Sequence, residues 1–240
     1  MSIPEQQPEA PWIVTDQADG QPYQAVWANE IGGTTWRIGT GPGTDHLRVQ
    51  PEHPEFDLRG ELARLEWVGR HLPTPRPVAW GSDGELEWLR TRSLDGENAV
   101  SERNRARPEV VVPALGRGLR RFHDSLPVRD CPFAWDVADR LAALSTTDRP
   151  EVPRLRPQDL VVCHGDACSP NLLLGEDGEC VGYADLGRLG VADRHADLAP
   201  AVLSLGWNYG PGWMLPFLKA YALPVDQERL AFYTWLWQAE

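Results

Sequence analysis

The sequence has few cysteines, and none of them forms a metal or redox motif. Only four of the 240 residues are cysteine, and they show neither a C-x-x-C pair nor the spacing of a zinc site. A chain of this length does not need disulfide bonds to fold, so we expect reduced thiols. This cysteine usage predicts a cytoplasmic protein.

Long apolar runs and an excess of positive charge are also missing. No apolar run approaches the roughly 20 residues that span a bilayer, and residues 1–11 lack the basic-then-apolar pattern of a signal peptide. The net charge is −12, whereas nucleic acids and anionic membranes attract basic surfaces. We therefore expect neither as a partner, and the acidic balance suits a cationic ligand.

Material for a hydrophobic core is abundant. Hydrophobic residues make up 42% of the chain and include 11 tryptophans, which argues against disorder. Short strand patterns broken by glycine and proline dominate as far as Arg92, and helical patterns dominate afterwards. We predict an α+β chain of two lobes, a small β-rich lobe at 1–92 and a larger helical lobe at 93–240. Residues 1–10 are expected to form a flexible tail.

The first lobe is predicted to contain several strands and one helix. A hairpin is expected over residues 24–38 and a strand over 45–50, and the spacing of leucines predicts a helix over 57–70. Glu61 falls on the apolar face of that helix. A carboxylate facing a core is costly unless a cation meets it, so Glu61 either rims the apolar stripe or has a cationic partner.

Residues 160–188 carry the most informative pattern in the chain, LVVCHGDACSPNLLLGEDGECVGYADLGR. Asp177-Gly178 lies between two apolar runs and predicts a hairpin with a two-residue turn. Glu176 then pairs with Glu179, and each outward step brings the next two residues together. This register sets Asn171 opposite Ala184.

Such a register brings three oxygen-bearing side chains to one end of the hairpin. Asn171 lies beside Asp185, and Asp166 is in the loop just before. Two carboxylates and an amide oxygen suit Mg²⁺, a hard cation. Phosphoryl transfer needs a base that orients the acceptor hydroxyl and metal ligands that neutralise phosphate charge. The D-x-x-x-x-N spacing followed by D-L-G is the kinase arrangement, so we predict a kinase.

In these motifs the chain resembles the aminoglycoside phosphotransferase family, whose catalytic loop reads H-G-D-x-x-x-x-N and whose metal strand ends in D-x-G-R. The resemblance extends to Arg59-Gly60-Glu61, Phe122-His123 and residues 190–197, and is greatest for the branch that phosphorylates a 3′-hydroxyl. It implies a protein-kinase-like two-lobed fold, with nucleotide bound by 1–92 and acceptor by 93–240. It also implies Mg²⁺, ATP or GTP as donor, and a cationic small-molecule acceptor.

The resemblance assigns the catalytic and metal-binding roles. Asp166 would be the base, and Asn171 and Asp185 would hold magnesium. His164 would organise the catalytic loop rather than act as a base. Glu61 would pair with a cation on a strand. Of the two alternatives for Glu61, the resemblance therefore favours a cationic partner over a position at the rim of the apolar stripe.

It also assigns donor-binding roles in the first lobe. Gly33 and Thr34 would cover the phosphates with backbone N–H groups. Thr91 and Ser93 belong to the expected hinge, residues 89–93, whose backbone would meet the purine. Arg48 stands where the family has a lysine; it remains cationic, but its forked guanidinium has a different geometry.

Acceptor contacts follow less directly from the motifs. Arg188 is expected to contact the acceptor or a phosphate, or alternatively to brace the lobes through a salt bridge. Glu240 and its terminal carboxylate are expected to bind an amine. The predicted function is phosphorylation of an aminoglycoside-type antibiotic. The alternatives are a kinase for another hydroxylated molecule, or a nucleotide-binding pseudokinase with Arg48 as its altered position.

Overall fold

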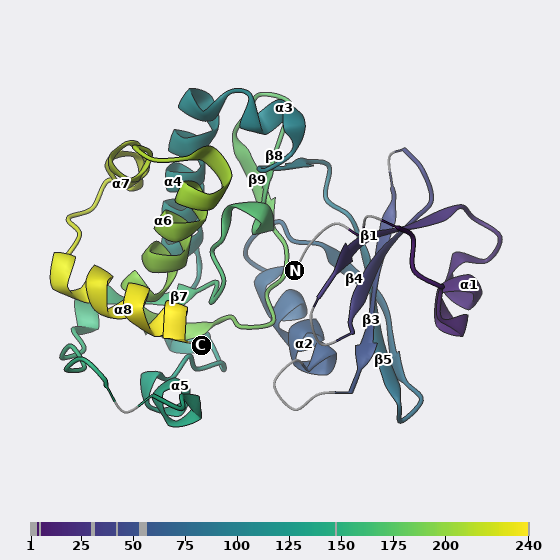
Figure 1. Ribbon diagram of the computed structural model, residues 1–240, viewed down its shortest axis with the longest axis horizontal. Helices are drawn as coiled ribbons and strands as arrows, with labels where there is room; N and C mark the ends of the chain where they lie inside the picture. Colours follow the sequence, from purple (N-terminus) through teal and green to yellow (C-terminus); the bar gives the residue numbers. More distant parts are fainter. Residues whose placement is uncertain are drawn as a thin grey trace. The chain divides into compact units, whose positions relative to one another are not determined.

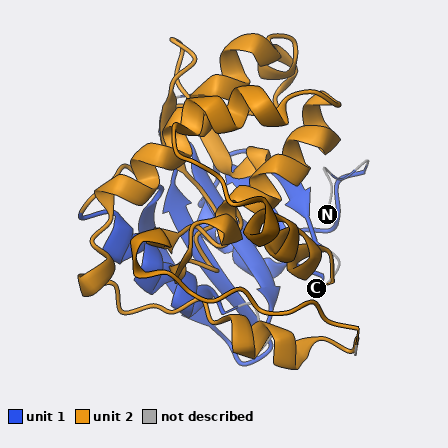
Figure 2. Ribbon diagram, turned by 90° about the vertical axis from the view of Figure 1, so that its left-hand side faces the viewer, with its two compact units in different colours: residues 1–70, 74–95 blue, residues 71–73, 96–240 orange. Residues whose placement is uncertain are grey.

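The computed structural model describes residues 4, 6–29, 32–41, 43–52, 57–146 and 148–239, and divides them into two compact units. Unit 1 comprises residues 1–70 and 74–95, and unit 2 comprises 71–73 and 96–240 (Figure 2). An antiparallel sheet dominates unit 1, whereas helices dominate unit 2, so the predicted α+β class is confirmed. No helix in the described ranges has both the length and the apolar character that crossing a membrane requires.

Unit 1 contains a five-stranded antiparallel sheet in the order β1-β2-β3-β5-β4. Figure 1 labels its strands β1, β3, β4 and β5. Its elements are α1 (Trp12–Ala18), β1 (Tyr23–Ala28), β2 (Thr34–Ile38), β3 (Asp45–Pro51), α2 (Leu58–Val68), β4 (Arg76–Ser82) and β5 (Leu86–Arg92). The predicted hairpin, the strand at 45–50 and the helix at 57–70 are confirmed. Asp57 begins that helix by accepting a hydrogen bond from the Arg59 N–H at 2.9 Å.

Two details of the N-terminal region differ from the sequence-based expectation. Helix α1 was not predicted, and it exists because Ile13, Val14 and Ala18 bury against strands β1 to β3. In the expected tail, the Gln7 side chain exchanges two hydrogen bonds with the backbone of Ala25, at 2.7 and 3.1 Å. Tertiary contacts therefore order parts of a segment whose own sequence pattern is weak.

Strand β3 separates a core face from a polar face. Leu47 and Val49 are buried in the cluster that includes α1, and Arg48 between them points to the other side, where α2 lies. This is the two-residue alternation of a strand. It lets one strand build the core of unit 1 and present a cation to α2.

Unit 2 holds helices around two small sheets, β6-β8-β9 and β10-β7 (Figure 1). Its elements are β6 (Glu97–Asn98), α3 (Glu102–Arg105), α4 (Pro108–Ser125), α5 (Val137–Ala143), β7 (Leu160–Cys163), β8 (Leu172–Leu174), β9 (Cys180–Tyr183), β10 (Gly190–Asp193), α6 (His195–Tyr209), α7 (Met214–Tyr221) and α8 (Gln227–Ala239), with short 3₁₀ turns at Val128–Asp130, Pro157–Asp159 and Ser169–Asn171. Helix α4 packs on α7, and α6 packs on α8. All four cysteines are free thiols.

The β8–β9 hairpin forms, but its turn is not the predicted one. The Gly178 N–H donates to Gly175 O at 3.0 Å and the Gly175 N–H to Glu179 O at 2.9 Å, which closes a loop of the residues 176–178. Gly178 has φ +82°, the left-handed conformation that glycine adopts at the end of such a loop. The predicted Glu176–Glu179 pair is therefore wrong.

A bulge in β9 restores the register that the sequence predicted. Leu174 pairs with Cys180, but Leu173 pairs with Gly182, so Val181 is the extra residue. Beyond the strands the Ala184 N–H donates to Asn171 O at 2.9 Å. Asn171 thus lies opposite Ala184, as predicted. The longer loop at 176–178 and the bulge at Val181, neither of which was predicted, compensate for each other.

Candidate active site

The catalytic loop, residues 164–168, runs from the end of β7 to the 3₁₀ turn before β8. Gly165 has φ +85°, and a Cβ atom at this position would lie 2.1 Å from the Arg188 carbonyl oxygen. Only glycine fits so close to another backbone. The glycine of the H-G-D motif therefore lets the loop pack directly against the segment that follows Asp185.

The hairpin register and the loop bring the three predicted catalytic residues together. The Asn171 side-chain Nδ2 donates to the Asp166 backbone carbonyl at 2.9 Å, so the amide oxygen is the atom that could bind a metal ion. Asp185 follows Ala184 in the left-handed region at φ 58°. Aspartate tolerates this conformation better than most residues, and such strain is common at functional sites.

Asp166 occupies an environment that favours proton uptake. Burial, and then the nearby charge of Asp185, raise the pKa of its carboxyl group, while hydrogen bonding to the Cys168 thiol opposes the shift. Its Oδ1 atom is buried and accepts no hydrogen bond from any described residue. A buried orphan acceptor beside a second carboxylate and an amide oxygen fits a reactant hydroxyl and a hard, oxygen-seeking cation such as Mg²⁺.

His164 joins the two strands that carry these residues. Its Nδ1 accepts from the Asp166 N–H at 3.3 Å, and its Nε2 lies 3.0 Å from the carbonyl oxygen of Ala184. This pair of partners assigns the neutral tautomer with the proton on Nε2. Both ring nitrogens are occupied by backbone groups, which supports a structural role for His164.

Asp197, at the start of α6, fixes the catalytic loop by accepting hydrogen bonds from its backbone. Its Oδ2 accepts from the His164 N–H at 2.7 Å and its Oδ1 accepts from the Gly165 N–H at 2.9 Å. His123 on α4 is bound to the same carboxylate at 2.9 Å and to the Tyr221 hydroxyl at 2.7 Å. One fully buried carboxylate thus ties the loop to three helices.

The sequence-based reasoning assigned no role to Asp197 or His123. The only indication of their importance in the sequence was that both lie in segments similar to the aminoglycoside phosphotransferase family. His123, Cys163 and Asp197 also place one potential ligand atom each within 4.8 Å of one another. Hydrogen bonds to Tyr221 and to backbone groups already account for the cluster, so we do not interpret it as a metal site.

The two predicted acceptor contacts, by Arg188 and Glu240, both stay predictions. Arg188 follows the D-L-G sequence, and its guanidinium carbon lies 5.8 Å from the centre of the Trp237 ring. It lies close enough to Asp166 for its charge to lower the pKa of that carboxyl group, against the larger raising effects. Glu240 lies outside the described residues, so its predicted contact stays a prediction.

In unit 1, Arg48 on β3 pairs with Glu61 on α2. The Arg48 Nη1 and Glu61 Oε2 atoms are 2.8 Å apart, and the Glu61 side chain is only 9% exposed. The structure therefore gives the core-facing carboxylate the cationic partner that the family resemblance implied. The cation is a guanidinium, a group whose forked N–H donors match the oxygens of carboxylates and phosphates.

Gly33 and Thr34 lie at the start of β2, in the predicted phosphate loop. The Gly33 N–H donates to the side chain of Asn29 at 2.6 Å, and the Trp36 indole N–H donates to the Thr34 hydroxyl at 2.8 Å. A Cβ atom on Gly33 would lie 2.6 Å from the Asn29 amide nitrogen. Asn29, which the sequence did not single out, therefore shapes this turn and holds the Gly33 N–H.

Thr91 and Ser93 lie at the end of β5, in the expected hinge. Thr91 pairs with His46 of β3, and the Ser93 N–H donates to the carbonyl of Thr44 at 3.0 Å. The Ser93 hydroxyl also lies 2.8 Å from His46 Nδ1. Because the Ser93 N–H already donates a hydrogen bond to Thr44, a purine would have to form its hydrogen bonds with other backbone groups of the hinge.

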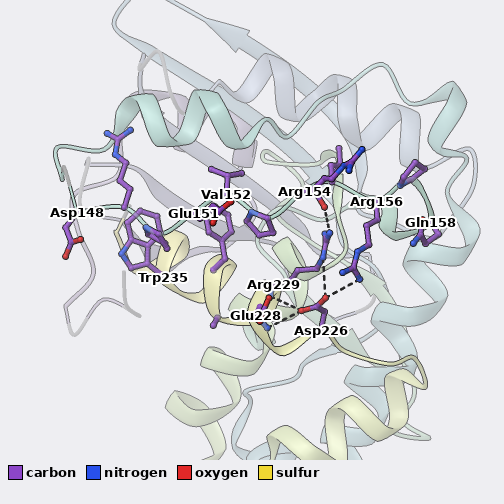
Figure 3. A pocket seen from close by; sticks show the side chains of 17 residues that line it. Asp148, Glu151, Val152, Arg154, Arg156, Gln158, Asp226, Glu228, Arg229 and Trp235 are labelled. Carbon is purple, nitrogen blue, oxygen red and sulfur yellow. Dashed lines mark hydrogen bonds and ion pairs between the residues drawn. The ribbon is translucent and has the colours of Figure 1, made fainter.

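A groove in unit 2 lies between residues 148–158 and one side of α8, with a volume of about 1200 Å³ (Figure 3). Within it Arg156 pairs with Asp226 at 3.2 Å, and Arg229 contacts both Asp226 and the carbonyl of Arg154. Its charged groups thus largely neutralise one another. None of its lining residues belongs to the catalytic loop or the β8–β9 hairpin, so we do not assign it to the acceptor.

Comparison with known proteins connects this geometry to a family. Residues 28–151 and 136–233 match the phosphotransferase enzyme family. The aminoglycoside 3′-phosphotransferase of Streptomyces fradiae is 38% identical to this chain, over 88% of the chain and 92% of the relative.

Solved structures show the same fold. The crystal structure of a type VIII aminoglycoside-3′-phosphotransferase has a TM-score of 0.78 at 29% identity, covering 92% of this chain and 94% of that one. An aminoglycoside phosphotransferase from Streptomyces rimosus, solved with ADP and streptomycin, has a TM-score of 0.71 at 24% identity, covering 93% and 96%. These likenesses confirm the predicted protein-kinase-like fold.

Proposed function

The chain belongs to the phosphotransferase enzyme family, and we propose that it transfers the γ-phosphoryl group of ATP or GTP to a hydroxyl group of an aminoglycoside-type antibiotic. The observation that carries the proposal is the convergence of Asp166, Asn171 and Asp185 at one end of the β8–β9 hairpin. The buried Oδ1 of Asp166, without a protein partner among the described residues, is the acceptor atom for a substrate hydroxyl.

Asp166 acts as the base in the proposed mechanism. Its carboxylate orients the acceptor hydroxyl and takes its proton as the new oxygen–phosphorus bond forms. The bond between the γ-phosphorus and the β–γ bridging oxygen breaks, and the nucleoside diphosphate leaves. The raised pKa of Asp166 makes it a better proton acceptor than a solvent-exposed aspartate.

The other predicted residues hold the donor. Asn171 and Asp185 are the proposed magnesium ligands, and bound magnesium would supply charge neutralisation on the phosphates. Arg48, fixed by Glu61, is the proposed phosphate-binding cation of unit 1. Gly33, Thr34 and the hinge containing Thr91 and Ser93 are proposed to line the nucleotide. Catalysis then consists chiefly of positioning and charge stabilisation.

The acceptor class rests on the relatives and on charge. The Streptomyces fradiae relative is named an aminoglycoside 3′-phosphotransferase, and aminoglycosides are polycations, which a chain of net charge −12 attracts. The proposed acceptor contacts are Arg188 and Glu240. The proposed compartment is the cytoplasm, where nucleoside triphosphates are available and the four free thiols stay reduced.

An acceptor panel tests this proposal. Purified protein is incubated with Mg²⁺, ATP or GTP, and individual aminoglycosides, other hydroxylated antibiotics and amino alcohols, and nucleoside diphosphate release is measured. We expect turnover with at least one kanamycin-type aminoglycoside and loss of turnover when Mg²⁺ is chelated. Turnover only with another acceptor class would refute the aminoglycoside assignment. Nucleotide binding without any turnover would support the pseudokinase alternative.

A further inference from the structure

The terminal helix α8 is fixed at its beginning to the strand that follows the catalytic segment. Arg229 is 3% exposed, and its guanidinium forms an ion pair with Asp193 on β10. Asp193 also binds His195 Nδ1 at 2.6 Å. Because a buried ion pair with additional hydrogen bonds allows little movement, the first turn of α8 is anchored to β10.

The same helix returns to that segment at its other end. Leu230, Phe232, Tyr233 and Leu236 are buried, which holds α8 along its length. Trp237, on the last turn, lies with its ring 5.8 Å from the guanidinium carbon of Arg188. Helix geometry puts about 12 Å between Arg229 and Trp237. Helix α8 therefore contacts residues 188–193 at two separate points.

Arg188 is itself constrained on both its backbone and its side chain. Gly165 of the catalytic loop packs against the Arg188 carbonyl so closely that no side chain fits between them. The Arg188 side chain also starts beside the catalytic loop, because a Cβ atom on Gly165, the residue before Asp166, would lie 2.8 Å from the Arg188 Cβ. The Trp237 ring beside the guanidinium restricts the rotamers of Arg188.

We infer that Trp237 is a positioning residue that holds the Arg188 guanidinium beside Asp166, where it stabilises the negative charge of the phosphoryl group in transfer. The inference rests on the proposed function, because it requires a phosphoryl group to be transferred beside Asp166. Trp237 itself touches no reactant in this arrangement. Its effect on the reaction passes entirely through Arg188, and that property can be tested.

The test is a double-mutant cycle on Trp237→Leu and Arg188→Ala. Trp237→Leu is expected to lower kcat about tenfold with little change in the nucleotide KM, since only an orienting contact is lost. In the Arg188→Ala background the same substitution should have no further effect. Trp237→Phe, which keeps a ring, should retain most of the activity. Equal losses in both backgrounds would overturn the inference.

Two measurements separate this inference from stability and from the proposed function. Trp207→Leu is the matched control, because Trp207 is 62% exposed and should change neither kcat nor the melting temperature. Ring-current shifts of the Arg188 Cδ protons by NMR report the contact without any turnover; they should disappear in Trp237→Leu and persist in Trp237→Phe. Unchanged Arg188 shifts in Trp237→Leu would refute the contact. Absence of turnover in the parent chain refutes the proposed function instead.

Discussion

The two halves of the candidate phosphoryl-transfer apparatus are built very differently. In unit 2, Asp166 lies in a loop whose backbone is fixed by His164, Asp197 and the hairpin. In unit 1, Arg48 is fixed by an ion pair with Glu61, and its side chain is 24% exposed. The proposed base is therefore positioned by buried hydrogen bonds to the main chain, whereas the proposed donor-binding cation depends on contacts between side chains.

This difference predicts unequal tolerance to substitution. Removing a side chain from the unit 2 network leaves buried partners without hydrogen bonds, and each such group carries a desolvation cost. Removing the Arg48 side chain leaves one carboxylate, Glu61, without its cation, and the 24% exposure of Arg48 lets water reach part of the vacated space. Substitutions in the two units should therefore differ in both stability and catalysis, and the following experiments measure that difference.

The largest effect is expected at the base itself. Asp166→Ala removes the proton acceptor, so turnover should fall by about 10²–10⁴-fold, the usual contribution of general base catalysis. Nucleotide binding, measured by calorimetry, should persist because the proposed magnesium ligands remain. The control is Asp159→Ala, an aspartate paired with Arg194 outside the catalytic loop. Unchanged turnover in Asp166→Ala would contradict the assignment of the base.

Asp197 should be the most important residue for holding the loop. Asp197→Ala leaves two backbone N–H groups and His123 without their acceptor, so we expect about 3–5 kcal/mol lower free energy of unfolding. Urea denaturation measures this loss. The matched control is Asp124→Ala on the exposed pair with Arg120, which should change stability by less than about 1 kcal/mol. Similar losses in the two variants would contradict the proposed network.

Arg48 should show a smaller effect, and one confined to the donor. Arg48→Ala is expected to raise the nucleotide KM roughly tenfold, the loss typical of one charge-assisted contact, with a smaller change in kcat. Arg48→Lys keeps a positive charge but loses the forked donors, so its nucleotide KM should lie between those of the parent chain and Arg48→Ala. Arg117→Ala, on the exposed pair with Glu179, is the surface control. An unchanged nucleotide KM in Arg48→Ala would remove Arg48 from the donor site.

The smallest effect is expected from thiol chemistry. Burial raises the pKa of the Cys168 and Cys163 thiols well above their usual range, so very little reactive thiolate exists at pH 7–8. Iodoacetamide should label Cys131 first, and activity should survive this treatment. Mass spectrometry of the labelled peptides identifies the site. Rapid labelling of Cys168 would show that the catalytic loop is more open than the base network implies.

Local sequence patterns predicted the parts of the fold whose determinants are local. Turn residues between two apolar runs were sufficient to predict the β8–β9 hairpin, and they placed Asn171 opposite Ala184. The predicted two-residue turn was wrong, because Gly178 in the left-handed conformation closes a loop of three residues, 176–178. The bulge at Val181 then compensated for the difference.

What the sequence could not predict depends on long-range partners. The role of Asp197 comes from helix packing that brings it to His164 and Gly165, more than 30 residues earlier. Asn29 acts on Gly33 through one side-chain orientation that no periodicity reports. Helix α1 exists because a sheet covers its apolar face, although its own pattern is short. Each of these features needs the tertiary structure.

The hairpin irregularities also determine where this chain can change in length. Inserting a residue among 172–174 would turn the following side chains to the opposite face and move Asn171 away from Asp185. A residue inserted between Glu176 and Asp177, which are both exposed, extends only the loop, because the pairs between that loop and Asn171 are unchanged. The tip of this hairpin is therefore the place for an epitope tag, a reporter insertion or new termini in a circular permutant.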